Sequence, residues 1–340
     1  MIVRSRAPLR LGFAGGGTDV SPYSDQFGGR ILNATISLYA YATIIPKIDG
    51  KIHFVSQDLE KEVVYDSQET LPLDGTLDLL KGVYNRMVDE FNLGALSFEL
   101  QTFVDAPAGS GLGTSSTLVV AIIGAFARWQ NIPLGEYDVA RLAYEIERKD
   151  LAMSGGKQDQ YAATFGGINF MEFYADDKVI VNPLRIQKEH ILELESNLVL
   201  FYTGSSRLSS KIIDVQIANT NKKVVKSLEA MHRLKQQATD MKNALLTGKL
   251  DTIGECLGEG WAFKKQMAEG ISNPFIDEIY DRAMNAGCTG GKVSGAGGGG
   301  FMFFYCPNNT KRDVIKALGG LDGQVKQFNF VKEGLVTWNI

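Results

Sequence analysis

Two glycine-rich segments in opposite halves of the chain constrain its fold more than any other feature. Residues 105–117 read DAPAGSGLGTSST and lead into an apolar, helix-like stretch, whereas residues 290–301 read GGKVSGAGGGGF and lead into a strand-like one. Because so much glycine costs chain entropy, each run indicates a backbone that closely approaches a ligand or another segment. The alternative is a pair of ordinary flexible turns.

Length and composition indicate a folded chain of two domains. Its 340 residues exceed one ordinary core, and 44% hydrophobic with 22% charged residues is usual for a globular protein. A polar, charged stretch at residues 183–196 separates two apolar regions. We therefore predict an N-terminal domain of residues 1–190 and a C-terminal domain of residues 191–340.

The periodicity of apolar residues predicts that both domains mix helices with strands, which is the α+β class. The expected strands are residues 36–46, 51–56, 62–66, 96–104, 198–203, 300–305 and 325–330. The expected helices are residues 77–91, 117–129, 139–149, 211–246, 252–268, 274–286 and 311–318.

Charge and cysteine content exclude several classes of protein. The formal net charge of −4, with both signs mixed along the chain, argues against nucleic acid and anionic membranes as partners. Three cysteines at unrelated spacings predict free buried thiols in a reducing compartment rather than disulfides or a zinc site. No stretch resembles a signal peptide or a membrane span, so we expect a cytoplasmic protein. The sequence leaves a homodimer open.

The first glycine segment has the chemistry of a phosphate cradle. Its glycines let the backbone approach an anion, and the helix that follows directs free N–H groups and a positive dipole end toward it. A turn with a serine or threonine N-cap is an equally simple interpretation, and the GKS/T ending of a Walker loop is absent. Together with the second glycine segment, the pattern favours one nucleotide held between the two. The expected phosphate-binding residues are Pro107, Gly109, Ser110, Gly111, Leu112, Gly113, Thr114, Ser115 and Ser116.

Two carboxylates between the glycine segments are candidates for work on a phosphate. Glu147 lies late on a predicted helix, and Asp159 follows a Gly155–Gly156 turn, so the two can converge from different elements. Phosphoryl transfer needs cations on the transferred group and a carboxylate beside the attacking hydroxyl. Solvated surface charge is the alternative, and it is what we expect of the neighbouring Arg148.

The N-terminal segment RAPLRLGFAGGGTDVSPY supplies a further cation and a further carboxylate. Arg10 lies in a strand-like apolar run, and the glycines at 15–17 lead into Thr18 and Asp19. A short carboxylate presented by such a turn suits paired hydrogen bonds from vicinal sugar hydroxyls. A hairpin turn capped by Asp19 is the alternative.

Taken together, these segments resemble the GHMP kinase family of galactokinase, homoserine kinase and mevalonate kinase. DAPAGSGLGTSST is similar to the family's P-x-G-x-G-L-G-S-S-A-A loop, and GGKVSGAGGGGF to its C-terminal G-A-K-x-T-G-A-G-x-G-G loop. The opening APLRLGFAGGGTD aligns with A-P-G-R-V-N-L-I-G-E-H-T-D of galactokinases. The resemblance implies an N-terminal domain of the ribosomal protein S5 second-domain type, a ferredoxin-like C-terminal domain, and ATP and Mg²⁺ bound between them.

The resemblance also implies roles for individual residues. Asp159 would be the catalytic carboxylate and Arg10 its cationic partner, while Ser115 and Glu147 would hold Mg²⁺. Asp19, with Gly17 and Thr18 beside it, would bind sugar hydroxyls. We add Gly297 of the second glycine segment to the expected substrate-binding residues.

One departure from the galactokinase pattern bears on the substrate. Gly16 and Gly17 stand where galactokinases have Glu and His, which argues for a bulkier or differently decorated sugar. The opening LRLGFAGGGTDVSPY is most similar to heptose 7-phosphate kinases and related fucokinase domains. A phosphate carried by the substrate would need cations, and Arg207, Lys157 and Arg30 are the candidates.

The resemblance therefore implies phosphorylation of the anomeric hydroxyl of D-glycero-α-D-manno-heptose 7-phosphate, in the synthesis of activated heptose. A free-sugar 1-kinase such as L-fucokinase is the first alternative. The second is a sugar-binding regulator without turnover, which the presence of Ser115, Glu147 and Asp159 disfavours. An isoprenoid-pathway kinase is disfavoured by the Arg10 and Thr18–Asp19 pattern.

Overall fold

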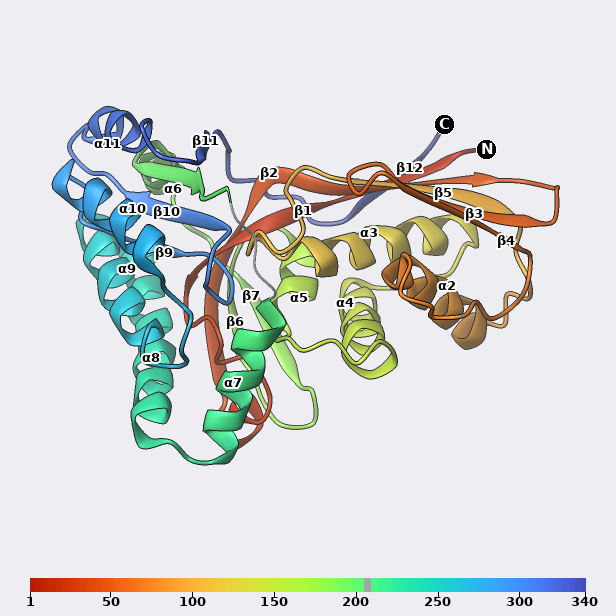
Figure 1. Ribbon diagram of the computed structural model, residues 1–340, viewed down its shortest axis with the longest axis horizontal. Helices are drawn as coiled ribbons and strands as arrows, with labels where there is room; N and C mark the ends of the chain where they lie inside the picture. Colours follow the sequence, from red (N-terminus) through yellow and green to blue (C-terminus); the bar gives the residue numbers. More distant parts are fainter. Residues whose placement is uncertain (205–208) are drawn as a thin grey trace.

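The computed structural model describes residues 1–204 and 209–340 (Figure 1). Its strands are β1 Val3–Ala14, β2 Gly29–Pro46, β3 Lys51–Ser56, β4 Lys61–Asp66, β5 Phe98–Val104, β6 Ile168–Phe173, β7 Val179–Pro183, β8 Leu198–Tyr202, β9 Gly290–Val293, β10 Phe301–Tyr305, β11 Gln324–Lys326 and β12 Val336–Asn339. Its α-helices are α1 Tyr23–Phe27, α2 Asp78–Phe91, α3 Thr114–Trp129, α4 Glu136–Glu145, α5 Gln158–Phe165, α6 Lys188–Ser196, α7 Ser209–Asn221, α8 Val225–Thr247, α9 Asp251–Lys264, α10 Pro274–Asn285 and α11 Lys311–Leu318. A π-helical turn, Ile146–Asp150, continues α4.

The N-terminal domain is built on one large sheet with the order β12-β1-β2-β5-β3-β4. The long strand β2 serves two partners, because residues 40–46 pair with β5 whereas residues 29–34 pair with β6. Strands β3 and β5 are parallel, and the other pairs in this sheet are antiparallel. Helices α2, α3 and α4 lie on one side of the sheet (Figure 1).

The C-terminal domain holds a second sheet, with the order β11-β8-β10-β9 and only antiparallel pairs among the described residues. Helices α7 to α10 connect β8 to β9, and α11 connects β10 to β11. Numbered within the domain, this is the strand order 4-1-3-2 of a ferredoxin-like fold. The predicted α+β architecture is thus confirmed.

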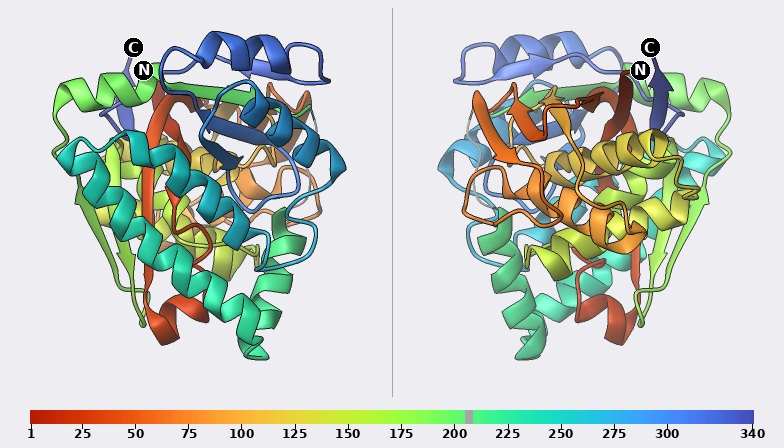
Figure 2. Two further views of the ribbon diagram at one scale, coloured as in Figure 1. Left: turned by 90° about the vertical axis from the view of Figure 1, so that its left-hand side faces the viewer. Right: turned by 90° about the vertical axis from the view of Figure 1, so that its right-hand side faces the viewer.

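A shared hydrophobic core joins the two domains. Helices α8 and α9 pack on β1, and α8 also packs on β2, so the far half of the N-terminal sheet faces the C-terminal helices (Figures 1 and 2). Phe13 of β1 lies 5.4 Å from Phe303 of β10, between ring centroids. Because buried side chains of both domains form one cluster, the two halves form a fixed cleft rather than loosely tethered units.

Some sequence predictions need correction. Residues 336–339 were assigned to the C-terminal domain, but they form β12, which pairs with β1 in the first sheet. The predicted helix at residues 211–246 is two helices, α7 and α8. The polar stretch at residues 183–196 contains α6, and β6, β7 and β9 were not expected.

None of the helices in the described ranges is both long and apolar enough to cross a membrane. Cys288 and Cys306 are buried free thiols, and Cys256 is a half-buried one. Burial raises the pKa of the Cys288 and Cys306 thiols to about 12, so both remain protonated and unreactive at neutral pH.

Candidate active site

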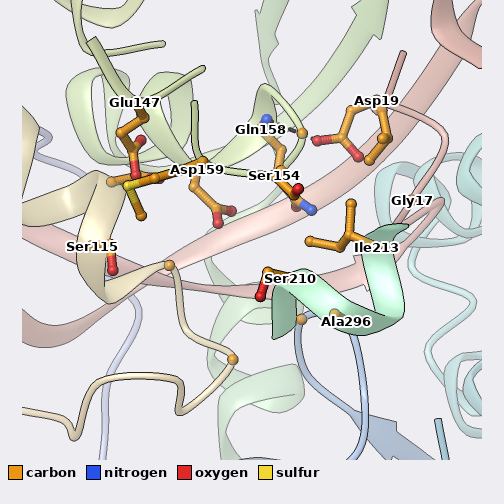
Figure 3. Close-up of a pocket in the computed structure, with 18 of the residues that line it drawn as sticks. Gly17, Asp19, Ser115, Glu147, Ser154, Gln158, Asp159, Ser210, Ile213 and Ala296 are labelled. Carbon is orange, nitrogen blue, oxygen red and sulfur yellow. Dashed lines mark hydrogen bonds between the residues drawn. The ribbon is translucent and has the colours of Figure 1, made fainter. Parts of the chain in front are cut away.

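A cavity of about 800 Å³ lies between the first glycine segment, the Asp19 turn and the C-terminal helices α7 and α9 (Figure 3). It gathers predicted residues that are far apart in the sequence. The predicted residues in its lining are Arg10, Gly17, Asp19, Gly109, Gly111, Gly113, Thr114, Ser115, Ser116, Glu147 and Asp159.

The first glycine segment forms one wall of this cavity. Gly109, Gly111 and Gly113 have φ angles of 73°, 81° and 78°, which L-residues rarely adopt. They turn the chain so that α3 begins at Thr114 beside the cavity. The free N–H groups and the positive dipole end of α3 therefore lie where a phosphate can meet them.

The second glycine segment packs directly on the first. A Cβ on Gly111 would lie 2.4 Å from the Ser294 carbonyl oxygen, and one on Gly295 would lie 2.7 Å from the Gly111 Cα. The Phe301 amide donates to the Ser110 carbonyl at 2.9 Å. The glycines thus permit contact between the domains, and no nucleotide can pass between the two segments at this point. Only Gly295 and Ala296 of the second segment line the cavity.

Arg10 and Asp159 form an ion pair at the centre of the cavity. The Arg10 Nε donates to the Asp159 Oδ1 at 2.6 Å, and Nη2 lies 2.6 Å from the same oxygen. Arg10 also donates to the Gly111 carbonyl at 2.5 Å, so one guanidinium fixes both the carboxylate and the glycine loop. A Cβ on Gly113 would lie 3.0 Å from the Asp159 Cγ, so this carboxylate sits against the start of α3.

Glu147 lies in the π-helical turn, a geometry that often marks functional positions. Its Oε2 accepts from the Gln160 amide at 2.5 Å, and Gln160 also donates to the Ser116 hydroxyl at 3.1 Å. Burial raises the pKa of the Glu147 carboxyl, partly opposed by Arg148 at 3.8 Å. A buried carboxylate with no closer cation in the described residues favours a positive charge in the cavity.

Asp19 lies at the other end of the cavity, opposite Ser115 and Glu147 (Figure 3). Its Oδ2 accepts from the Lys157 and Gln158 amides at 2.8 and 3.0 Å, which holds the carboxylate at the start of α5. A Cβ on Gly156 would lie 1.9 Å from this oxygen, so glycine is required there. Burial raises the pKa of Asp19, and the nearby Asp159 charge adds to that effect.

Several predicted residues support the cavity without lining it. The Thr18 hydroxyl is held in the turn, where it donates toward the carbonyls of Gly15 and Arg30 and accepts from the Arg30 amide. Leu112 is buried, and its carbonyl accepts from the Arg10 amide at 3.2 Å. The other residues of this kind are Pro107, Ser110 and Gly297.

Of the three cations suggested for a second phosphate, Lys157 and Arg30 do not line the cavity. The Lys157 ammonium lies 3.0 Å from Asp177 and 3.7 Å from Asp25, while the Lys157 backbone amide donates to Asp19. Arg30 points to Thr239 and Glu172. Arg207 lies outside the described residues.

Other lining residues were not predicted. Arg148, expected to be solvated, donates to the Gly156 carbonyl at 3.3 Å and borders the cavity. Gln216 of α7 donates to the Gly17 carbonyl at 2.7 Å, and Lys264 ends α9 at the cavity wall. Helical periodicity alone gives no signal for Gln216 and Lys264, because they look like ordinary polar positions on C-terminal helices.

Comparisons with known proteins agree with this geometry. The GHMP kinases N terminal domain model matches residues 78–167, and the GHMP kinases C terminal model matches residues 241–320. The D-glycero-alpha-D-manno-heptose 7-phosphate kinase of Campylobacter jejuni is 51% identical over 338 residues, which cover 99% of each chain.

Two further proteins extend the comparison. The crystal structure of a D-glycero-D-manno-heptose 1-phosphate kinase from Bacteroides thetaiotaomicron has a TM-score of 0.85, 48% identity and 99% coverage of both chains. The L-fucokinase/L-fucose-1-P guanylyltransferase of Bacteroides fragilis is 27% identical over 89% of this chain and 34% of its own length. With full-length identity near one half and both family models matched in order, the chain belongs to the GHMP kinase family.

Proposed function

We propose that this protein transfers the γ-phosphoryl group of ATP to the anomeric hydroxyl of D-glycero-α-D-manno-heptose 7-phosphate. The product would be the 1,7-bisphosphate, which supplies activated-heptose synthesis. The observation that carries the proposal is the 51% identity, over nearly the whole chain, to a kinase named for that substrate. The cavity, with its phosphate-loop wall and its Asp19 end, supports it.

The Arg10–Asp159 ion pair acts on the sugar hydroxyl that accepts the phosphoryl group. In the transfer, the sugar oxygen bonds to the γ-phosphorus while the bond from that phosphorus to the β–γ bridging oxygen breaks, and ADP leaves. Asp159 orients the attacking hydroxyl and accepts its proton. Arg10 holds the Asp159 carboxylate through two nitrogens, so the carboxylate is already in place when the sugar arrives.

The end of the cavity where Ser115 and Glu147 lie, which we call the donor end, fits a Mg²⁺ ion beside the ATP phosphates. Mg²⁺ prefers oxygen ligands and takes one or two protein groups together with phosphate oxygens and water. Glu147 offers a buried carboxylate and Ser115 a hydroxyl on the same wall. No cluster of three or more His, Cys, Asp or Glu suitable for a metal occurs in the described ranges, which suits an ion completed by substrate. When bound, Mg²⁺ neutralises charge on the phosphates.

A free-sugar kinase is the second candidate, because about a third of a protein named L-fucokinase/L-fucose-1-P guanylyltransferase aligns with 89% of this chain. Both reactions would use the same Arg10–Asp159 pair and the same phosphate loop. They differ in whether the acceptor carries a phosphate of its own. The predicted cytoplasmic location and the homodimer remain predictions under either reaction.

A coupled ADP-release assay of the purified protein tests the proposal. The acceptors are D-glycero-D-manno-heptose 7-phosphate, the corresponding 1-phosphate, sedoheptulose 7-phosphate, L-fucose, mannose and galactose. We expect the highest kcat/KM with the aldoheptose 7-phosphate. A higher value with L-fucose would replace the proposed acceptor, and the absence of turnover with every sugar would indicate a binding protein.

A further inference from the structure

Lys264 is a buried cation at the cavity wall that the chemistry above does not use. It is the last residue of α9 and is 4% exposed, yet it lines the cavity. A Cβ on Gly16 would lie 3.5 Å from its Nζ, so the ammonium lies beside the glycine turn that precedes Asp19. A side chain at position 16 would therefore be in contact with this ammonium.

The other buried cations near Lys264 have partners. Arg10 is paired with Asp159, and the Lys292 Nζ donates to the Phe13 carbonyl at 3.3 Å. By contrast, within residues 1–204 and 209–340, no hydrogen bond or close ion pair involves the Lys264 Nζ. The Asp19 charge acts on it electrostatically, but the Asp19 Oδ2 already accepts two backbone amides.

A buried ammonium without a partner is costly, and an anionic ligand removes that cost. Burial lowers the pKa of Lys264 to about 8, so most molecules carry the charge at neutral pH. At this end the cavity therefore holds a buried ammonium that makes no hydrogen bond in the described part of the chain, and Asp19 is the carboxyl that acts on it electrostatically.

The position of Lys264 indicates which anion it meets. Asp19, Gly17 and Ile213 lie at one end of the cavity, and Ser115 and Glu147 lie at the other (Figure 3). Lys264 is beside the first group, through Gly16 and Asp19. The ATP phosphates belong with the start of α3 at the second group, so the anion at Lys264 comes from the acceptor.

The surroundings of Gly16 and Gly17 differ, which bears on where the anion lies relative to the glycine turn. A Cβ on Gly17 would lie 2.7 Å from the Met267 Cε and 3.0 Å from the Gln216 side chain. The room gained by glycine at position 17 is therefore filled by the protein itself. Among the described residues, a Cβ on Gly16 would by contrast have the Lys264 Nζ as its one neighbour within 4 Å beyond the adjoining residues.

We propose that Lys264 binds the phosphate that the acceptor sugar carries before the reaction, and that it thereby selects phosphorylated over free sugars. This role rests on the proposed function. Lys264 takes the place that the sequence suggested for Lys157 and Arg30, both of which are engaged with other side chains.

The test compares two ligands and two adjacent lysines. Lys264→Met keeps the length of the side chain and removes its charge. Lys265→Met is the matched control, because Lys265 is exposed and lies 3.9 Å from Asp277. Calorimetry measures the binding of D-glycero-D-manno-heptose 7-phosphate and of the same heptose without phosphate, and circular dichroism checks the fold of each variant.

We expect Lys264→Met to weaken binding of the heptose 7-phosphate by about 10- to 100-fold, the usual loss of a hydrogen bond between charged groups. Binding of the free heptose should change by less than about threefold, and Lys265→Met should change neither. An equal loss for both ligands would show that Lys264 contacts the sugar or supports the fold, and it would overturn the proposal. Unchanged binding of both ligands would overturn it as well.

The wild-type protein separates this proposal from the proposed function. If it phosphorylates the heptose 7-phosphate and the two ligands respond equally to Lys264→Met, only the role of Lys264 is wrong. If the wild-type protein neither binds nor phosphorylates the heptose 7-phosphate, both proposals are wrong.

Discussion

In the account proposed here, the two ends of the cavity recognise phosphate by different means. At the donor end, the backbone of the first glycine segment and the start of α3 present N–H groups, with the Ser115 hydroxyl and the Glu147 carboxylate beside them. The opposite end, which we call the acceptor end, is formed by single side chains from distant elements. Asp19 follows β1, Gln216 comes from α7 and Lys264 from α9. A local segment forms most of the first end, to which the π-helical turn adds Glu147, whereas the tertiary fold assembles the second.

This difference teaches where specificity can change. A glycine loop that binds by its backbone is nearly indifferent to which sugar lies opposite, and its conformation depends on positive φ angles at Gly109, Gly111 and Gly113. The acceptor end depends on single side chains, so one substitution there can change the preferred sugar without disturbing the phosphate loop.

The largest expected effect is at Asp159, where the two ends meet. Asp159→Asn keeps the shape of the side chain but removes its ability to accept a proton, so kcat should fall by about 10²- to 10⁴-fold. Nucleotide and sugar affinities should change little, since backbone amides hold one and the Asp19 end holds the other. Steady-state kinetics with calorimetry for ATP and sugar measure these quantities. A variant that keeps more than about a tenth of kcat would contradict the assigned role.

A substitution at Glu147 tests whether the two ends act separately. Glu147→Gln should raise the Mg²⁺ concentration needed for half-maximal rate by about 10- to 100-fold, because a charged ligand is lost. The affinity for the sugar phosphate, measured without nucleotide, should remain as in the wild type. A matching loss of sugar affinity would show that the ends are coupled rather than independent.

The buried lysines Lys157 and Lys264 should differ in what they contribute to the unfolding free energy of the ligand-free protein. Lys157 is paired with Asp177 and Asp25, so Lys157→Met should lower the unfolding free energy by about 1–3 kcal/mol. Lys264 has no such partner within the described part of the chain, so Lys264→Met should leave the ligand-free protein as stable or about 1 kcal/mol more stable. Denaturant titration of the ligand-free variants measures both. The reverse order of stabilities would mean that Lys264 is a structural residue.

The smallest expected effect is a pH dependence of acceptor binding. With a folded-state pKa of about 8, Lys264 is protonated below that pH and loses its charge above it. The affinity for the sugar phosphate should therefore fall above about pH 8, by at most about tenfold per pH unit. Arg10, Asp19 and Lys292 face the same region, so the control is Lys264→Met, in which this fall should be absent. An identical pH profile in wild type and variant would assign the titration elsewhere.

The glycine-segment wall at the donor end could be predicted from the sequence because its residues are consecutive. Gly109, Gly111, Gly113 and Ser115 lie in one segment, and α3, whose N-terminal N–H groups face the cavity, begins within it. The strands and helices with clear periodicity, such as β3 and α11, also lie where the pattern predicts them. Such features depend on local backbone physics.

The acceptor end could not be predicted in the same way. Lys264 and Gln216 are single polar residues on helices, and only packing of α9 and α7 against the Asp19 turn brings them to the cavity. Lys157 illustrates the opposite case, because its position in the sequence suggested a ligand whereas its side chain is neutralised by carboxylates. The return of β12 to the first sheet likewise depends on a long-range pairing that no local pattern records.

The most direct test of the central claim is the identity of the product. Phosphorus NMR of the reaction with ATP and D-glycero-D-manno-heptose 7-phosphate should show two sugar phosphates, one of them coupled to the anomeric proton. That result would establish transfer to the anomeric hydroxyl of a sugar that already carries a phosphate. A new phosphate coupled to any other proton, or hydrolysis of ATP without a second sugar phosphate, would contradict the account.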